Sequence, residues 1–511
     1  MRKVKSFLEQ WGLHAFLLPV FFVTHNYQQY YGLVSSSVAF RLGLTILLFF
    51  FLFSLLLFVL TKHLNKSLQL VTLFGFIILF FGVLKDFLQL SLHAHFLSKY
   101  LVLIPIIIIS SIFLTRTVIK KKDFRRSNLF LNTLILFFLA VDISMLAAFR
   151  SASLHNNLLI KNNSLKPSKF RPTDEMPNVY FLVFDSYPGT SFLRQHMNYD
   201  NTPFNQKLKD KGFYIVRSPK SNYNRTAFSI ASTLNFSYLK NIEKNHYISP
   251  KDYAEANLTI KEAIVPQFFE HLNYSVYNLS VFDIGHSAPI HRETFFTMPE
   301  KNILLYNTLP QRLKDDLLWN LLEGKYAIPL VQKIFARNEV EVQKENEQKN
   351  FFNRKALDSL LKITSQKTNF PKFVYAHFYL PHPPFFYDEN GKENNIKYIM
   401  TKSSLENKDL FLSYLKYTNK IIEELIDIIN RTSSNKSVII VQSDHGFRDF
   451  AGSEKCPECF FKNYSAIYFP DKDYSTLYDT LSNINTFPIL LNKYFDSKIP
   501  LQKDSCIFLK N

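Results

Sequence analysis

Long apolar stretches dominate the first 150 residues of this chain, and the pattern of hydrophobic and polar positions changes abruptly after them. Four stretches are close to the roughly 20 residues that a helix needs to cross a bilayer. They cover residues 42–61, 67–84, 100–119 and 129–149. Residues 10–40 carry no Lys, Arg, Asp or Glu and give a fifth candidate centred on 13–23. The pattern therefore predicts a membrane domain of about five spans over residues 1–150.

Basic residues gather in every second connection between these spans, which predicts their orientation. They precede the first span, separate the second from the third, and crowd the connection between the fourth and fifth. These residues are Arg2, Lys3, Lys5, Lys62, Lys66, Arg116, Lys120, Lys121, Lys122, Arg125 and Arg126. We expect the amino terminus inside the cell and everything after residue 149 outside. Asp142, within the fifth span, is either an intramembrane functional acid or a polar residue packed between helices.

After residue 150 the pattern becomes that of a globular protein. Residues 151–175 are polar, contain two prolines and predict a linker. Beyond them, short β-branched and aromatic runs alternate with helical patterns, which predicts an α/β domain with a mostly parallel central sheet over 176–511. Residues 307–366 are charged and helical in pattern, and we interpret them as a solvated helical excursion from that domain.

Two of the predicted strands end in side chains that bind metals. The run at 178–184 leads into Asp185, and the run at 438–441 leads into Asp444, His445 and Gly446. Reactive groups in open α/β sheets collect at the carboxyl ends of strands. Carboxylate oxygen and imidazole nitrogen are ligands for divalent metals. Asp-His-Gly alone is also an ordinary turn, but two such strands together suggest a metal site.

Thr226 stands between a polar loop and a helical segment rich in small residues. A hydroxyl at the head of a helix gains from the unpaired amides and the positive dipole end there, which suits a group that must carry a phosphate. The commonest role for Thr at this place is an N-cap, and the segment by itself favours that role. His382 follows a further strand in a loop held by prolines and is a functional candidate; His377 is either functional or packed in the strand.

Net charge and cysteine content restrict the kinds of partner and of covalent link that the protein can have. The net charge is +18, which together with the spans favours an anionic lipid surface, and we find no nucleic-acid-binding motif. Three cysteines are too few for a disulfide scaffold. Cys456 and Cys459 form a local disulfide, remain two free thiols, or bind zinc with further ligands that the sequence does not reveal.

These segments together resemble the alkaline phosphatase superfamily, in particular its membrane-anchored sulfatase-like branch with lipoteichoic acid synthases and phosphoethanolamine transferases. The resemblance rests on residues 178–185, 222–235, 377–385 and 438–446, whose order and separation match, and on the spans before them. It implies an alkaline-phosphatase-like α/β domain behind the membrane domain.

The resemblance also implies roles for individual residues. Thr226 corresponds to the nucleophile, and one divalent metal (manganese, zinc or magnesium) is expected on Asp185, Thr226, Asp444 and His445. His382 corresponds to a substrate-binding histidine that stabilises phosphoryl oxygens or protonates the leaving group. His377, Asn222 and Arg225 are expected beside the substrate.

We therefore expect an enzyme of a bacterial inner (plasma) membrane with its catalytic domain outside the cytoplasm. It would move a phosphoglycerol- or phosphoethanolamine-type head group from a membrane phospholipid, through a phosphorylated Thr226, to an envelope glycan or lipid. We expect no nucleic acid and no obligate protein partner. The alternatives are a membrane-bound phosphodiesterase, phosphatase or sulfatase, and a non-catalytic polytopic partner.

Two departures from the family patterns bear on these alternatives. The Cys- or Ser-Pro-Arg motif of true sulfatases does not surround Thr226, which argues against sulfate ester hydrolysis. Phosphoethanolamine transferases have a histidine downstream of the Asp-His-Gly motif, but no histidine follows His445. This argues against a second metal site of that type.

Overall fold

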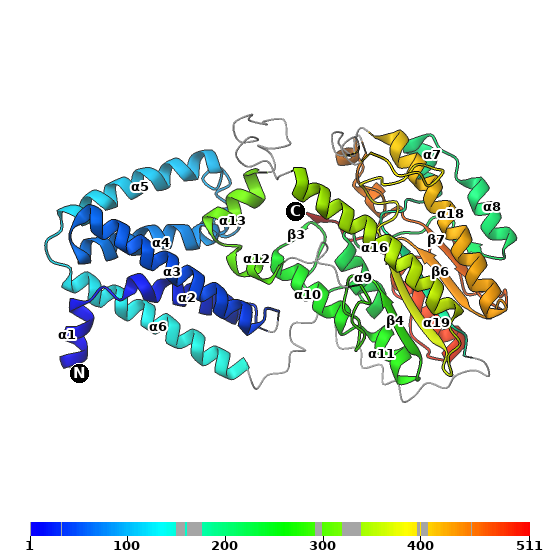
Figure 1. Cartoon of the computed structure of the whole chain (residues 1–511), viewed down its shortest axis with the longest axis horizontal. Helices are drawn as coiled ribbons and strands as arrows, with labels where there is room; N and C mark the ends of the chain where they lie inside the picture. The colour runs from blue at the N-terminus through cyan, green and yellow to red at the C-terminus, as the bar shows by residue number, and fades with distance from the viewer. Residues whose placement is uncertain are drawn as a thin grey trace. The chain divides into compact units, whose positions relative to one another are not determined.

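The computed structural model describes residues 2–31, 33–149, 159–160, 176–291, 299–318, 339–395, 399, 407–450 and 452–510. The chain divides into two compact units. One comprises Met1–Asn156 and Met298–Ala336, and the other comprises Asn157–Thr297 and Arg337–Asn511 (Figure 1).

The first unit consists of long apolar helices. They are α1 (Arg2–Gln10), α2 (His14–Gln29), α3 (Ser36–Thr61), α4 (Leu64–Asp86) with its continuation η1 (Phe87–Ser91), α5 (Tyr100–Lys120) and α6 (Arg125–Phe149). Four of the described helices are long and apolar enough to cross a membrane. α1 and α2 meet at a 94° bend and give a fifth span if the pair is counted as one. The prediction of a helical membrane domain is thereby confirmed, with four spans or, if the bent pair is counted, the expected five.

Asp142 lies inside this helical unit and is buried. Its carboxylate is 3.1 Å from Nδ1 of His25, so it joins α6 to α2. A carboxylate in an apolar helix pair needs such a partner because an unpaired charge is costly to bury. The structure therefore places Asp142 as a polar residue between helices.

A short segment from the second half of the chain also belongs to the first unit. It contains α12 (Glu300–Leu305), α13 (Leu309–Leu313) and the π-helix η4 (Lys314–Leu318). Gly82 donates its amide to the carbonyl of Asn307 at 2.8 Å, and Arg312 pairs with Asp86. The expected continuous domain over 176–511 and the single excursion over 307–366 therefore differ from the structure. The segment joins the apolar helices because its charged side chains find partners there.

The second unit is built on a six-stranded sheet of order β2-β7-β6-β1-β5-β4. β4 (Ser275–Leu279), β5 (Lys372–Phe378), β1 (Val179–Phe184) and β6 (Val438–Gln442) are parallel. β7 (Ser465–Tyr468) and β2 (Tyr214–Ile215) complete one edge as antiparallel strands. Every residue of β1, β5 and β6 is buried, as expected for parallel strands covered on both faces. The predicted mostly parallel sheet is confirmed.

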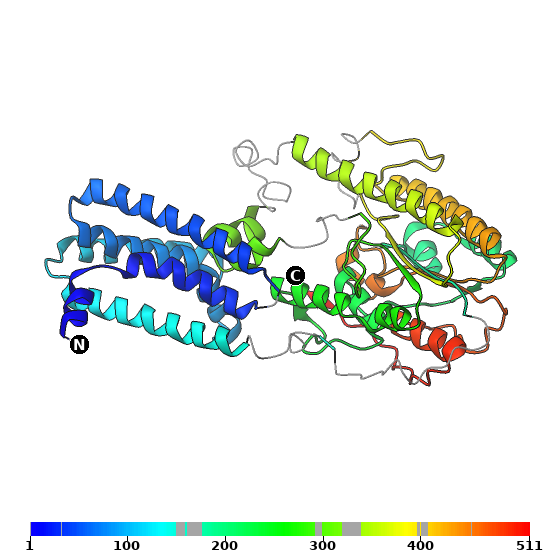
Figure 2. The same ribbon diagram turned by 60° about the horizontal axis from the view of Figure 1, so that its bottom comes forward.

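Helices cover both faces of this sheet. Figure 2 shows the long helices α16 (Glu339–Ser365) and α18 (Lys408–Ser433) side by side on one face, with α10 (Pro250–Lys261), α11 (Ile264–His271) and α19 (Thr486–Phe495) on the other. The remaining elements are α7 (Thr190–Met197), α8 (Thr202–Asp210), α9 (Thr226–Asn235), the short pair β3 (His246–Tyr247) and β8 (Leu509–Lys510), and the 3-10 turns η6 (Ser453–Lys455), η7 (Pro457–Phe461) and η8 (Asn483–Asn485).

Candidate active site and metal centre

The two strands predicted to deliver metal ligands are direct neighbours. β1 and β6 run parallel, with Val183 opposite Gln442, so Asp185 and the Asp444–His445 pair emerge at the same edge of the sheet. All three side chains are buried, and one ligand atom from each lies within 4.8 Å of the others. Nε2 of His445 is 3.3 Å from Asp444 Oδ2 and 3.6 Å from Asp185 Oδ1.

Backbone groups hold these ligands in place. Oδ1 of Asp444 accepts hydrogen bonds from the amides of Ser186 and His445, at 3.1 and 2.9 Å. Nδ1 of His445 lies 2.9 Å from the carbonyl oxygen of Gly446, so Nδ1 carries the proton and donates it. Nε2 is then the nitrogen with the free lone pair. Such a second bond on the far ring nitrogen is what orients a metal-binding histidine.

The chemistry of the donors fits a divalent cation. Oδ2 of Asp185 and Oδ2 of Asp444 are buried and meet no hydrogen-bond donor among the described residues. Burial raises the pKa of Asp185 well above its ordinary value, and the nearby charge of Asp444 raises it further. Burial lowers the pKa of His445 to about 3, so its imidazole is neutral at pH 7. Two buried carboxylates facing a neutral imidazole favour a bound cation, because it would neutralise charges that otherwise repel.

Thr226 brings a hydroxyl to the same place. It is the first residue of α9, Arg225 occupies the N-cap position, and Thr226 Oγ1 lies 3.2 Å from His445 Nε2. The role as a simple N-cap, which the local sequence favours, is therefore wrong. The reason is tertiary: the neighbour that engages the hydroxyl is 219 positions away in the sequence.

Positive charge from two arginines lies beside Thr226. Burial lowers the pKa of Arg225, and the adjacent guanidinium of Arg448 lowers it further. Arg448 also donates to the carbonyl oxygen of Asn224 at 3.0 Å, which ties it to the loop before α9. Two guanidinium groups at a helix N-terminus form a place suited to a phosphoryl group. Sequence reasoning missed Arg448, although it follows the Asp-His-Gly turn by only two positions.

The two histidines of the 377–385 stretch occupy different environments. His377 is buried in β5 with Nδ1 2.9 Å from the hydroxyl of Tyr375, and the charge of Asp444 acts on its imidazole. His382 is half-buried, packs on the ring of Tyr379 at 4.3 Å, and donates from Nδ1 to the carbonyl oxygen of Pro383. Burial lowers the pKa of His382 to about 4. Its imidazole is therefore neutral at pH 7, with Nε2 as the nitrogen that carries the lone pair.

Asn222 does not fit the role expected for it. Its side-chain oxygen accepts from the amide of Ile484 at 2.7 Å, and its side-chain nitrogen donates to Tyr238 Oη and Ser505 O. The residue is fully buried. Asn222 therefore ties the loop before α9 to the C-terminal part of the chain, and its amide is already engaged with the protein.

The sequence of the chain matches a known protein family. The sulfatase family model matches residues 177–487, which is more than half of the chain. The chain belongs to the sulfatase family. The predicted membership of the alkaline phosphatase superfamily is thereby confirmed, and the matched range contains Asp185, Thr226, Asp444 and His445. No curated protein sequence matches the chain.

Solved structures give distant likenesses. The C-terminal periplasmic domain of EcEptC from Escherichia coli is 12% identical with a TM-score of 0.39, over 69% of this chain and 93% of that one. The integral membrane lipooligosaccharide phosphoethanolamine transferase A (EptA) from Neisseria meningitidis is 12% identical with a TM-score of 0.36, over 95% of both chains. The phosphonate monoester hydrolase of Agrobacterium radiobacter is 12% identical with a TM-score of 0.33, over 62% and 74%.

Proposed function

We propose that this protein is a metal-dependent transferase that moves a phosphoryl-linked head group from a membrane phospholipid to an envelope glycan or lipid. The head group is of the phosphoglycerol or phosphoethanolamine type, and Thr226 carries it between donor and acceptor. The observation that carries this proposal is the position of the Thr226 hydroxyl, at the start of α9 and 3.2 Å from His445 within the Asp185–Asp444–His445 group.

Asp185, Asp444, His445 and the Thr226 hydroxyl would hold one divalent cation. When bound, such an ion lowers the pKa of a hydroxyl and neutralises charge on phosphoryl oxygens. Manganese, zinc and magnesium all remain candidates, because mixed oxygen and nitrogen ligands do not choose among them.

The chain's own residues account for two transfer steps. In the first, Thr226 Oγ1 gives up its proton and bonds to phosphorus, the bond from phosphorus to the diacylglycerol oxygen breaks, and that oxygen takes up a proton and leaves as diacylglycerol. In the second, an acceptor hydroxyl gives up its proton and bonds to phosphorus, the bond from phosphorus to Thr226 Oγ1 breaks, and Oγ1 takes up a proton. Arg225, Arg448 and the amides at the start of α9 bind the anionic oxygens. Nε2 of His382 takes the proton from the acceptor hydroxyl.

We place the catalytic unit outside the cytoplasm of a bacterial inner membrane. The helices of the first unit supply the membrane spans, and the basic residues between the fourth and fifth spans mark the inner side. Reporter fusions after Lys122 should be active only as cytoplasmic reporters, and fusions after Lys161 only as external ones. The reverse pattern would contradict this orientation.

Mass spectrometry of Thr226 tests the reaction. Purified protein is incubated with a divalent metal and vesicles of phospholipid labelled in the head group. We expect release of diacylglycerol and a labelled Thr226, and Thr226→Ala should show neither. Thr233→Ala is the matched control on the same helix, because its hydroxyl donates to the Ser229 carbonyl within α9.

Two other outcomes decide for the alternatives. Rapid turnover of soluble phosphate esters, with vesicles ignored, would establish a membrane-bound hydrolase. A wild-type protein that is inert towards both substrates and binds no metal would be a non-catalytic partner.

A further inference from the structure

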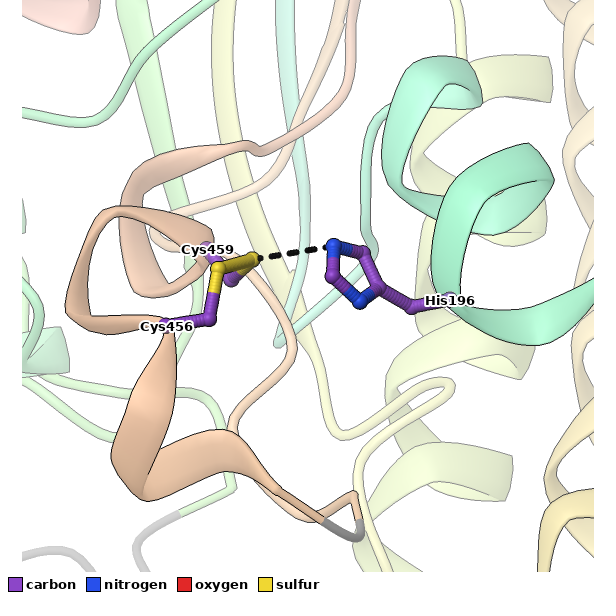
Figure 3. A group of neighbouring side chains, drawn as sticks. All are labelled: His196, Cys456 and Cys459. Carbon is purple, nitrogen blue, oxygen red and sulfur yellow. Dashed lines mark hydrogen bonds between the residues drawn. A yellow bond between two sulfur atoms is a disulfide. The ribbon is translucent and has the colours of Figure 1, made fainter.

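A second group of metal-binding side chains lies away from the strand ends that carry the active site. It consists of His196, at the end of α7, and Cys456 and Cys459, which flank the start of η7 (Figure 3). The two cysteines form a disulfide, and Nε2 of His196 lies 3.3 Å from Cys459 Sγ. The local disulfide is thus the alternative that the structure shows. His196 is a neighbour that the sequence could not reveal, because it is 263 positions from Cys459.

The imidazole of His196 is held in this orientation by aromatic packing. Its ring stacks on Phe192 at 5.0 Å and lies 5.5 Å from the ring of Phe450. Nε2 of His196 faces the sulfur of Cys459, so the lone pair of the neutral imidazole points towards the position that a metal bound to this sulfur would take. A disulfide sulfur is a weak partner for it, whereas a thiolate is a strong metal ligand.

We propose that His196, Cys456 and Cys459 form a second metal site, which opens when the disulfide is reduced and then binds one thiophilic divalent cation of the zinc class. A dithiol reductant supplies two electrons and two protons, giving two cysteine thiols and its own disulfide. The cation then displaces one proton from each thiol and bonds to both sulfurs and to His196 Nε2.

The ligand set matches what zinc takes in proteins. Two cysteines separated by two residues and one histidine are a usual zinc combination, with water or a further side chain in the fourth position. Water would take that position, because the described residues bring only these three ligand atoms within 4.8 Å of one another. The cation can enter from solvent past His196, because this residue is exposed whereas both cysteines are buried.

The chain that follows Cys459 reaches all three loops of the active site. The carbonyl oxygens of Phe460, Phe461 and Lys462 accept hydrogen bonds from the amides of Gly446, Ser221 and Gly189, at 2.8, 3.0 and 2.9 Å. These loops lead to His445, Thr226 and Asp185. A change between disulfide and metal at Cys459 therefore acts on a segment that supports the catalytic ligands. The metal-site proposal itself does not depend on which reaction Thr226 performs.

Cobalt spectroscopy of the full-length protein in detergent tests the proposal. The protein is treated with a phosphine reductant, which does not compete for metal as a dithiol would, and is titrated with Co²⁺. We expect a thiolate-to-cobalt charge-transfer band in the reduced protein and none in the oxidised protein. The catalytic site cannot produce this band, because its ligands are oxygen and nitrogen. Asp444→Asn should therefore keep the band.

Two variants identify the ligands, and two others serve as controls. Cys459→Ser should abolish the band, and His196→Ala should weaken cobalt binding at least about 10-fold, as loss of a metal ligand does. Cys506→Ser is the matched control, because Cys506 is the remaining free cysteine, and it should keep the full band. His286→Ala is the control for loss of an exposed histidine.

Several results would overturn the proposal. They are an absent band in the folded reduced protein, a band that survives Cys459→Ser, and cobalt affinity unchanged by His196→Ala. Loss of folding on reduction, followed by circular dichroism, also counts against it, because the site requires a folded dithiol form. Labelling of Thr226 in the oxidised protein is a separate measurement, so failure here and failure of the proposed reaction are distinguishable.

Discussion

Two clusters in the second unit each place a histidine beside potential metal ligands, but they are built in opposite ways. Asp185, Asp444 and His445 stand at the ends of buried parallel strands, and backbone amides and a carbonyl fix their orientation. His196, Cys456 and Cys459 stand on a helix end and a 3-10 turn, with the sulfurs joined to each other. The buried carboxylates of the first cluster carry negative charge that a bound cation would neutralise. The sulfurs of the second cluster are bonded to each other in a disulfide.

The difference shows why one metal site is present in every redox state and the other only after its disulfide is reduced. Carboxylates at the ends of rigid strands cannot move apart to relieve their repulsion, so the fold itself favours a bound ion. Two thiols can instead form a disulfide when conditions are oxidising, and the histidine beside them then binds no metal. Three predictions test this contrast, and a fourth concerns a histidine–carboxylate pair outside both clusters.

The largest effect is expected from Asp444→Asn. Loss of this carboxylate removes a ligand from the strand-end cluster, so metal should be lost and Thr226 labelling should fall at least about 1,000-fold, since the ion supplies several kcal/mol of transition-state stabilisation. Metal analysis and the labelling assay measure the two effects. Asp210→Asn, an exposed acid on α8, is the control. Full metal occupancy in Asp444→Asn would remove Asp444 from the ligand set.

Two histidine variants separate a residue with a proposed catalytic role from a residue of the metal site that forms only on reduction. His382→Gln removes the proton acceptor for the second step, so transfer to the acceptor should slow about 100-fold while phosphorylated Thr226 accumulates. His196→Ala should leave the rate of the oxidised protein unchanged. Single-turnover labelling with and without acceptor measures both. Equal losses in the two variants would mean that His196 also contributes to catalysis in the oxidised protein.

Gly446→Ala disturbs the point where the clusters meet. A Cβ at Gly446 would lie 2.3 Å from the carbonyl oxygen of Cys459, a backbone atom that cannot easily move. We expect the free energy of unfolding to fall by at least about 2 kcal/mol. Gly452→Ala is the control, because its φ of +82° gives strain of about 1 kcal/mol but its Cβ has open space. Equal stability of the two variants in denaturant titrations would show that the contact is not tight.

The smallest effect concerns an imidazole–carboxylate pair at the surface. Nδ1 of His286 lies 2.8 Å from Glu270 Oε2, and this hydrogen bond raises the pKa of His286. Stability from this pair is therefore present below the unfolded pKa of about 6.5 and is lost as pH rises through the raised value. Wild type should exceed Glu270→Gln slightly in melting temperature at pH 5.5 to 6.5, by roughly a degree or less, and not at pH 8. A gap that persists at pH 8 would exclude this linkage.

The local sequence was enough to predict the elements and the chemical class of the site. The apolar stretches mark the helices of the first unit, and buried β-branched runs mark β1 and β6, because both patterns reflect burial of neighbouring side chains. Asp185 and the Asp444–His445 pair could be joined in advance because parallel strands present their carboxyl ends at one edge.

Contacts between distant segments were decided only by the tertiary structure. Thr226 differs from an N-cap because His445 lies beside it, Asn222 is engaged by Ile484, and His196 faces Cys459. Residues 299–318 join the first unit because Asp86 and Arg312 pair there. Each of these partners is far along the chain from the residue that it contacts. Periodicity and propensity report only near neighbours, so the sequence determined which side chains were available, and packing decided which of them meet.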